Sequence, residues 1–171
     1  MVEYYDREEL FRAKIQRKKT LALYLVLLGV FIAVSVGLLV WYLTLPYRSP
    51  KIATVKIIQY AITFVFTAFS FIYLGIKFKR VNRYYHLLYN LETGIRETST
   101  ASFFEYDEDL QEKDGVDFKA LIFLEWNKYK KDFYERKVLV FYEKEFPKFN
   151  ENDNVRFITQ GNVLISYEIL S

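Results

Sequence analysis

Carboxylate side chains gather in one short stretch of the chain and are the first candidates for chemistry. The stretch holds seven of them: Glu105, Asp107, Glu108, Asp109, Glu112, Asp114 and Asp117. An EF-hand loop with Gly115 at its sixth position would place Leu110 first and Leu121 twelfth, and leucine cannot ligate calcium. The motif therefore fails, and we expect a solvated loop between strands rather than a metal site.

Other reactive groups are sparse. His86 is the only histidine, and no carboxylate or cysteine lies three or four residues away to complete a metal site. The chain has no cysteine, which excludes disulfides and thiolate chemistry. Glycine-rich phosphate loops and the G-x-S-x-G and H-E-x-x-H motifs are absent. We therefore predict that the protein is not an enzyme, with no catalytic residue, no cofactor and no metal.

Two long apolar stretches, residues 21–45 and 57–76, dominate the N-terminal half and contain no charged residue. A helix needs about 20 apolar residues to cross roughly 30 Å of hydrocarbon, so both stretches are long enough. The segment 46–51 between them holds Pro46 and Pro50, which cannot continue a helix. We predict a transmembrane hairpin over residues 21–76. With no charge at mid-depth, we do not expect a proton relay or an ion pathway.

Positive charge is concentrated beside these spans. Residues 1–96 hold 14 Lys/Arg and 5 Asp/Glu, whereas residues 97–171 hold 10 Lys/Arg and 16 Asp/Glu. The turn offers only Arg48, Lys51 and Lys56, so the positive-inside rule places both termini in the cytoplasm of a plasma membrane, which we expect to be bacterial. The cations expected to contact anionic lipid flank the hairpin: Arg17, Lys18, Lys19, Lys77, Lys79, Arg80 and Arg83.

Small and hydroxyl side chains recur at helical spacing in both spans. Gly29, Ala33 and Gly37 form a small-residue stripe in the first span. In the second span the corresponding helix-packing residues are Thr63, Thr67 and Ser70. One interpretation is that the two faces pack against each other within the hairpin. The other is that one of them binds a partner's helix or a second copy of the chain.

Helical periodicity continues on the cytoplasmic side of both spans. Residues 1–20 predict an amphipathic helix, with Asp6 and Glu9 as a capping box, that runs directly into the first span. Residues 77–96 predict a juxtamembrane extension of the second span, ending near Gly94. We expect Phe11 and Ile15 to pack against Val81, Tyr85 and Leu88 on the apolar face of that extension.

The apolar period changes to two in residues 97–171, which predicts a cytoplasmic β domain. Five candidate strands lie near residues 101–106, 116–125, 135–143, 154–159 and 162–169, and Gln160–Gly161 reads as a tight turn. We expect an OB-like or SH3-like barrel. This arrangement resembles bacterial membrane-anchored proteins that end in an OB-type barrel, on fold-level pattern alone.

Basic and aromatic residues are interleaved after the second candidate strand and into the start of the third. They follow Trp126 and are Lys128, Tyr129, Lys130, Lys131, Phe133, Tyr134, Arg136 and Lys137. A solvated loop is one interpretation, and contact with anionic lipid headgroups is the other. Nucleic-acid binding is not expected, because residues 97–171 carry a net negative charge.

These features together indicate a non-enzymatic, membrane-anchored scaffold or interaction protein. We expect its β domain to bind a protein partner or a second copy of the chain. The alternative is a sensor or accessory subunit of a membrane transporter, whose β domain would bind a small molecule or a lipid headgroup. That alternative requires a cavity inside the β domain.

Overall fold

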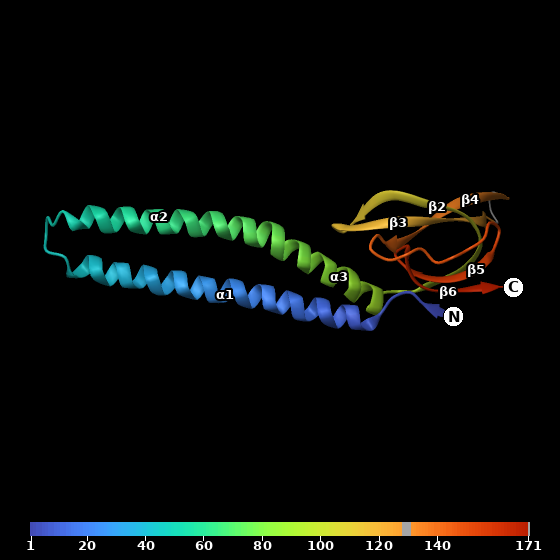
Figure 1. Ribbon diagram of the computed structural model, residues 1–171, viewed down its shortest axis with the longest axis horizontal. Coiled ribbons are helices and arrows are strands. Elements are labelled where there is room, and N and C mark those ends of the chain that lie inside the picture. Colours follow the sequence, from blue (N-terminus) through green and yellow to red (C-terminus); the bar gives the residue numbers. More distant parts are fainter. Residues whose placement is uncertain (128–130, 171) are drawn as a thin grey trace. The chain divides into compact units, whose positions relative to one another are not determined.

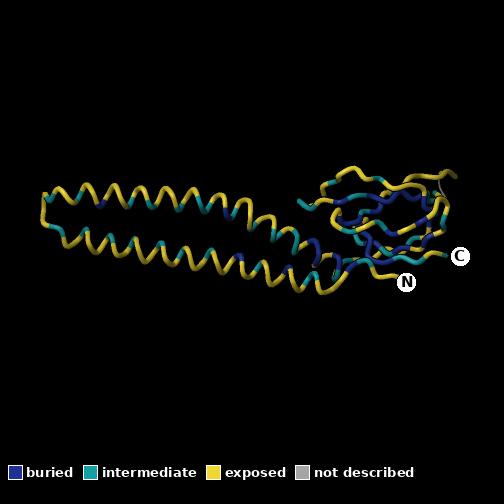
Figure 2. The backbone as a smooth tube through the Cα atoms, in the orientation of Figure 1, coloured by how far each residue is buried: buried dark blue, intermediate teal, exposed yellow. Residues whose placement is uncertain are grey.

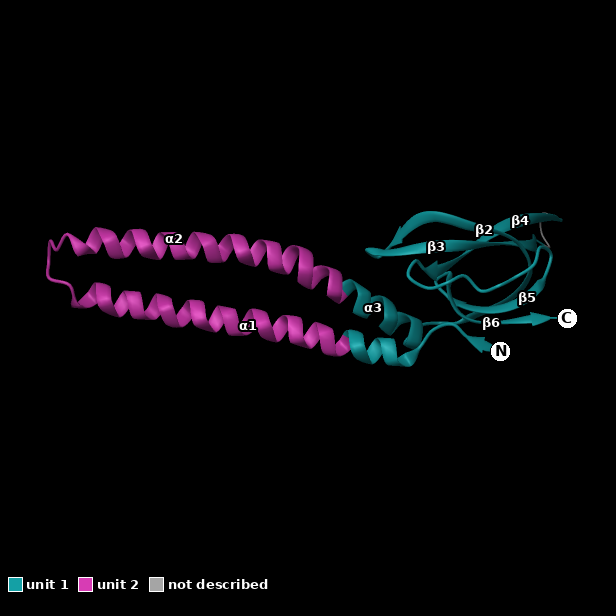
Figure 3. Ribbon diagram, in the orientation of Figure 1, with its two compact units in different colours: residues 1–13, 83–171 teal, residues 14–82 magenta. Residues whose placement is uncertain are grey.

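The computed structural model describes residues 1–127 and 131–170. It divides into two compact units, which Figure 3 shows in different colours. The helical unit comprises residues 14–82, and the barrel unit comprises residues 1–13 and 83–171.

Two long helices form the helical unit, as the apolar stretches predict (Figure 1). The first, α1, spans Arg7–Thr44 without a break. The second runs over Lys51–Thr93 and consists of α2 (Lys51–Ile72), a π-helical segment η1 (Tyr73–Phe78) and α3 (Lys79–Thr93). It begins at Lys51, six residues before the expected apolar stretch, because Pro50 occupies its N-cap with a helical backbone. Both helices are long and apolar enough to cross a membrane.

The barrel unit contains a closed ring of five strands, which confirms the prediction of a small β-barrel. These are β2 (Glu97–Lys113), β3 (Val116–Asn127), β4 (Asp132–Phe141), β5 (Asn154–Gln160) and β6 (Val163–Leu170). Around the ring the order is β2, β3, β4, β6, β5 and back to β2. All neighbours are antiparallel except β4 and β6, which meet in parallel through the single pair Leu139 and Val163.

Five of the seven acidic residues, from Glu105 to Glu112, lie in strand β2, which corrects the expectation of a loop; Asp114 lies in the β2–β3 turn and Asp117 in β3. β2 pairs with β3 up to its last residue, Lys113, which lies opposite Val116. The pairing register shifts between Phe103 and Glu105 and again between Asp107 and Gln111. Such bulges bend a strand and increase its twist, so one long strand can pair with β5 at one end and β3 at the other.

The N-terminal residues join the barrel instead of the helix. Val2–Glu3 forms the short strand β1, which pairs with β6 opposite Ser166 and Tyr167. The helix expected over residues 1–20 therefore begins only at Arg7. Phe11 does not pack as predicted, because 64% of its surface is exposed. Leu10 and Ala13 contribute to the apolar cluster in its place, so the buried helix face lies beside the expected one.

Two apolar clusters stabilise the barrel unit. The first fills the ring with buried side chains, which include Phe103, Phe123, Phe149 and Phe157. The second joins the end of the ring to α3 through Leu87, Leu88, Leu91, Phe118, Phe141 and Val163. A ring this small buries a limited core, and the apolar face of α3 enlarges it.

Candidate membrane-anchoring surface and barrel contacts

The helical unit presents apolar side chains to its surroundings. Figure 2 shows exposed residues along both helices. Phe64 and Phe71 are each 76% exposed, and Val26, Val30 and Val65 are also exposed. Exposed apolar surface of this extent on a soluble protein marks a site of interaction with protein or membrane.

Aromatic rings hold α1 and α2 together. Phe31 stacks on Phe66 with 4.2 Å between ring centroids, and Tyr24 stacks on Tyr73 at 5.9 Å. The Tyr73 hydroxyl donates a 3.0 Å hydrogen bond to the carbonyl oxygen of Thr20. Tyr73 is the first residue of η1, so the π-helical segment begins where the two helices are joined by this bond.

The predicted helix-packing residues lie mostly outside this contact. A Cβ atom added to Gly29 or Gly37 would meet nothing within 4 Å, and Ala33 is exposed between them. Thr67 is exposed as well, while Thr63 accepts a hydrogen bond from Gln59. The described helix contact uses only one member of the two sets: Ser70 accepts a 3.3 Å hydrogen bond from the Tyr24 hydroxyl.

A groove of about 460 Å³ runs between α1 and α2. Five of its ten lining residues are apolar residues of α1 between Phe31 and Leu39. Its polar residues are Ser35, Gln59, Lys56 and Tyr42. Gln59 Nε2 donates to the hydroxyl oxygen of Ser35 at 3.1 Å, and the Lys56 ammonium lies 5.9 Å from the centre of the Tyr42 ring.

All acidic residues of the chain lie in one of the two units, whereas basic residues occur in both. Residues 14–82 carry 10 Lys/Arg and no Asp/Glu, so every one of the 21 acidic residues belongs to the barrel unit. The cations expected to contact lipid all lie in the helical unit except Arg83. The Arg83 side chain lies against the β2–β3 turn, where a Cβ atom on Gly115 would meet its Nη1 at 2.8 Å. Lys77 lies over the Tyr73 ring at 5.5 Å.

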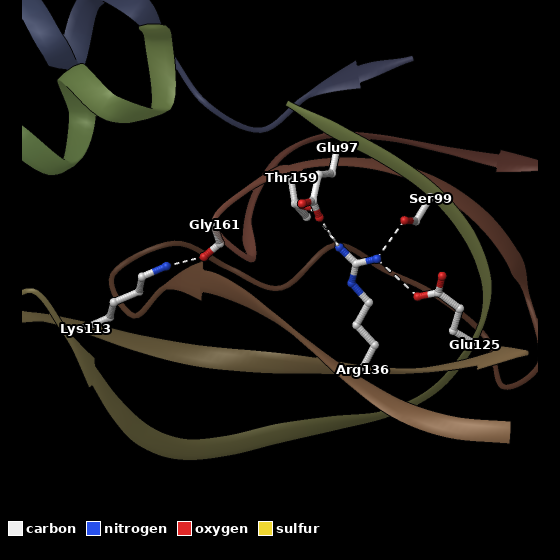
Figure 4. A network of polar contacts seen from close by, with 7 residues as sticks. All are labelled: Glu97, Ser99, Lys113, Glu125, Arg136, Thr159 and Gly161. Carbon is white, nitrogen blue, oxygen red and sulfur yellow. Dashed lines mark hydrogen bonds and ion pairs between the residues drawn. The ribbon is translucent and has the colours of Figure 1, made fainter. Parts of the chain in front are cut away.

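Arg136 of β4 is the centre of a polar network at the barrel (Figure 4). Its Nη1 donates to Ser99 at 2.7 Å and to a Glu125 carboxylate oxygen at 3.1 Å. Its Nη2 donates to a Glu97 carboxylate oxygen at 3.1 Å and to Thr159 at 3.3 Å. The arginine side chain is only 14% exposed and therefore joins four of the five ring strands from a largely buried position.

The sequence analysis placed Arg136 at the start of the candidate strand 135–143 and counted it in the basic segment expected to be a solvated loop or a lipid contact, and it did not predict this network. The alternation of side chains along the strand could have shown that Arg136 faces inward. Val138 and Val140 are buried in the ring, and a side chain two residues earlier points to the same face. Extending that alternation back to Arg136 would have turned the arginine inward.

Lys144 attaches the N-terminal strand to the barrel. Its ammonium donates to the carbonyl oxygen of Tyr4 at 3.0 Å and pairs with Glu9 at 2.8 Å. The amides of Tyr4 and Tyr5 both donate to the carbonyl oxygen of Ile165. Burial, together with the nearby carboxylates of Glu92 and Glu9, raises the pKa of Tyr5 to about 12.

We predict that Lys144→Met loosens this attachment. The methionine keeps the apolar stem but removes two charge-assisted contacts, so the free energy of local opening should fall by about 1–2 kcal/mol. Hydrogen exchange at the Tyr4 and Tyr5 amides should accelerate accordingly. Lys148→Met removes an exposed ammonium and is the control. Equal exchange rates in the two variants would contradict the role assigned to Lys144.

The residues first considered for chemistry occupy separate places. Asp107 accepts a hydrogen bond from Lys137, and this bond lowers the pKa of its carboxyl. His86 is exposed beside the Tyr85 ring. Within residues 1–127 and 131–170, no group of three or more acidic or histidine side chains is placed to hold a metal ion.

The basic and aromatic segment is only partly visible. Lys128, Tyr129 and Lys130 lie outside the described residues. Trp126 and Phe133 are exposed and meet edge to face, with 4.9 Å between ring centroids. Trp126 follows Phe118 by eight residues along β3, which corresponds to about 26 Å of strand, so this ring pair lies far from the α3 contact of Phe118.

Comparison of the chain with protein-family models, with curated proteins and with solved structures found no match.

Proposed function

We propose that the protein is a membrane-anchored interaction protein. The helical unit is a two-span anchor, and the barrel unit is the module that binds a partner. The observation that carries the proposal is the exposed apolar surface of α1 and α2, typified by Phe64 and Phe71, beside a barrel unit with its own buried core. Hydrocarbon solvates such a surface without the cost that water imposes.

The charge distribution supports an orientation with both ends of the chain in the cytoplasm. Seven of the ten cations of the helical unit lie at the ends of the helices away from the connecting turn: Lys14, Arg17, Lys18, Lys19, Lys77, Lys79 and Arg80. The positive-inside rule places these flanks in the cytoplasm, where they face anionic lipid headgroups. We propose a plasma membrane as the location of the hairpin, with this orientation.

The barrel is of the OB type in this proposal. Its ring is not in sequence order, since β6 lies between β4 and β5, and a five-stranded Greek-key barrel is the OB arrangement. The two turns that border the ligand-binding groove in OB barrels, β2–β3 and β5–β6, make contacts within the barrel unit itself. Lys113 at the end of β2 donates to the carbonyl oxygen of Gly161 in the β5–β6 turn (Figure 4). Arg83 lies against Gly115 of the β2–β3 turn.

One surface available to a partner is the aromatic pair of the β3–β4 hairpin, which we define as Trp126 and Phe133, opposite each other in neighbouring strands. Both rings are exposed, and exposed aromatic residues are enriched where proteins bind proteins. The barrel unit holds 14 Lys/Arg against 21 Asp/Glu, which disfavours nucleic acid as the partner. A ligand-sensing barrel would need interior space, and Phe103, Phe123, Phe149 and Phe157 occupy the interior.

Carbonate washing of membranes tests the anchor. The full chain should stay in the membrane pellet, because alkaline carbonate removes only peripheral proteins. Val30→Lys combined with Phe64→Lys places two cations on exposed faces of the spans, at about 2.5–3.5 kcal/mol each for central positions, and should release the chain. Phe104→Lys combined with Leu110→Lys on exposed positions of β2 is the control and should stay in the pellet.

Crosslinking tests the interaction module. A photoreactive residue at Phe133 in native membranes should give a discrete adduct with a protein partner or with a second copy. The same residue at Lys148, which is also exposed, should not. A strictly monomeric chain at both positions would argue against an interaction protein.

A further inference from the structure

The groove between α1 and α2 is about as long as one membrane leaflet is deep. Its lining on α1 extends from Phe31 to Tyr42, eleven residues apart, which is about 16 Å along the helix axis. A hydrocarbon core of roughly 30 Å has leaflets of about half that depth. Tyr42 lies two residues before the end of α1 at Thr44, so the groove begins near the connecting turn and ends close to the middle of the spans.

The end of the groove near the connecting turn carries one positive charge, that of Lys56, and the helical unit contains no acidic residue to pair with it. Lys56 lines the groove at the level of Tyr42, with its ammonium over the phenol ring. Because residues 14–82 contain no Asp or Glu, no carboxylate of the helical unit can neutralise Lys56. The lining thus combines an apolar slot, formed by residues such as Ile32, Val36 and Leu39, with a single positive charge at its entrance.

We infer that this groove binds an anionic phospholipid of the leaflet next to the connecting turn. One acyl chain lies in the slot beside Ile32, Val36 and Leu39, and the phosphate pairs with Lys56 at the headgroup level. The inference rests on the proposed membrane anchor. It goes beyond it by assigning a lipid class, a leaflet and a binding residue on the side opposite the cation-rich flanks.

Charge complementarity favours this occupant over a second copy of the hairpin. A second helical unit in the groove would bring ten more cations and no carboxylate side chain to meet Lys56. A phosphodiester supplies the missing negative charge, and its acyl chain matches the apolar lining. Lys56 can reach the headgroup level along its apolar stem while its charge stays hydrated.

Native mass spectrometry of the full chain tests the assignment. The chain is purified in mild detergent from carbonate-washed membranes and mixed with phosphatidylglycerol or with phosphatidylcholine of the same acyl chains. The wild type should retain one phosphatidylglycerol in preference to phosphatidylcholine. Lys56→Gln should reduce that preference about fivefold, as expected for one lysine facing an anionic headgroup. Lys51→Gln, which removes a cation outside the groove lining, is the matched control and should keep the preference.

A second variant separates the slot from the charge. Val36→Trp fills the groove and should abolish retention of either lipid while Lys56 is intact. Equal retention of the two lipids by the wild type, an unchanged preference in Lys56→Gln, or a lipid-free dimer would each overturn the assignment. Failure of the membrane anchor is a different result, since the chain would then leave the membranes in the carbonate wash before any lipid is added.

Discussion

Phe123→Ala should destabilise the barrel strongly, lowering its free energy of unfolding by about 3–5 kcal/mol. Phe123 has no exposed surface and lies at the centre of the cluster that fills the ring. Its ring centroid is 4.5 Å from that of Phe157 and 5.7 Å from that of Phe103. Truncation leaves a cavity between strands that close on one another, so the neighbours cannot collapse to fill it.

Phe133→Ala is the matched control for this prediction. It removes the same side chain from the same hairpin, but Phe133 is 59% exposed, so its loss should change the free energy of unfolding by no more than about 0.5 kcal/mol. Both variants are measured by urea unfolding of the full chain in detergent, with Trp126 fluorescence as the probe in a Trp41→Phe background. Equal losses in the two variants would contradict the described core.

Arg136→Met is expected to have the second largest effect, a loss of about 2–4 kcal/mol in the free energy of unfolding. Removing one member of a buried ion pair leaves its partner without compensation and costs about 3–5 kcal/mol when both are buried. The value here is lower because Glu97 is largely exposed, whereas Glu125 is mostly enclosed. The methionine also loses the contact of the guanidinium with the Phe157 ring, at 5.5 Å.

A double-mutant cycle distinguishes a lost ion pair from lost packing. Glu125→Gln in the Arg136→Met background removes the stranded carboxylate charge and should recover part of the stability. Lys137→Met is the control from the adjacent position, because the Lys137 side chain is half exposed and pairs with one carboxylate only, that of Asp107, so it should lower the free energy of unfolding far less than Arg136→Met does. A similar loss for Lys137→Met, or no recovery in the double variant, would show that Arg136 does not act through its carboxylate partners.

The elements with strong periodicity could be predicted from the sequence. The two apolar helices follow from uncharged stretches of the required length, and the five ring strands follow from alternation bounded by turns. The turn expected at Gln160–Gly161 lies one residue later, at Gly161–Asn162, because Gln160 is the last residue of β5. The turn at Gly161 needs a positive φ, which the structure shows at +53°, and glycine provides this at little cost.

Other features have weak local signals because tertiary contacts decide them. β1 is two residues long and forms through its pairing with β6, so it is too short to show an alternation of apolar and polar residues in the sequence. Ala13 is buried and Leu10 partly buried, whereas Phe11 is exposed, because the chain enters α1 from a barrel strand, which fixes the rotation of the helix. The acidic stretch was assigned to a loop on charge, although strand β2 tolerates carboxylates wherever its side chains face solvent.

The small-residue stripe shows the limit of motif reasoning in membrane spans. Spacing indicated a close-packing face over Gly29, Ala33 and Gly37, but spacing does not say which partner the face meets. In the described hairpin the contact is aromatic, between Phe31 and Phe66 and between Tyr24 and Tyr73. The stripe is therefore open to lipid or to another helix, and the crosslinking experiment applies to it as well.

The central claim is that the hairpin crosses a membrane and leaves the barrel in the cytoplasm. Because the chain has no cysteine, one introduced thiol reports on one position. Tyr47→Cys lies in the turn, where Tyr47 is 89% exposed, and Glu151→Cys lies at an exposed turn of the barrel unit. In intact cells, a membrane-impermeant maleimide should label the cysteine at position 47 at once and the one at position 151 only after lysis. Labelling of position 151 in intact cells, or protection of position 47, would contradict the account.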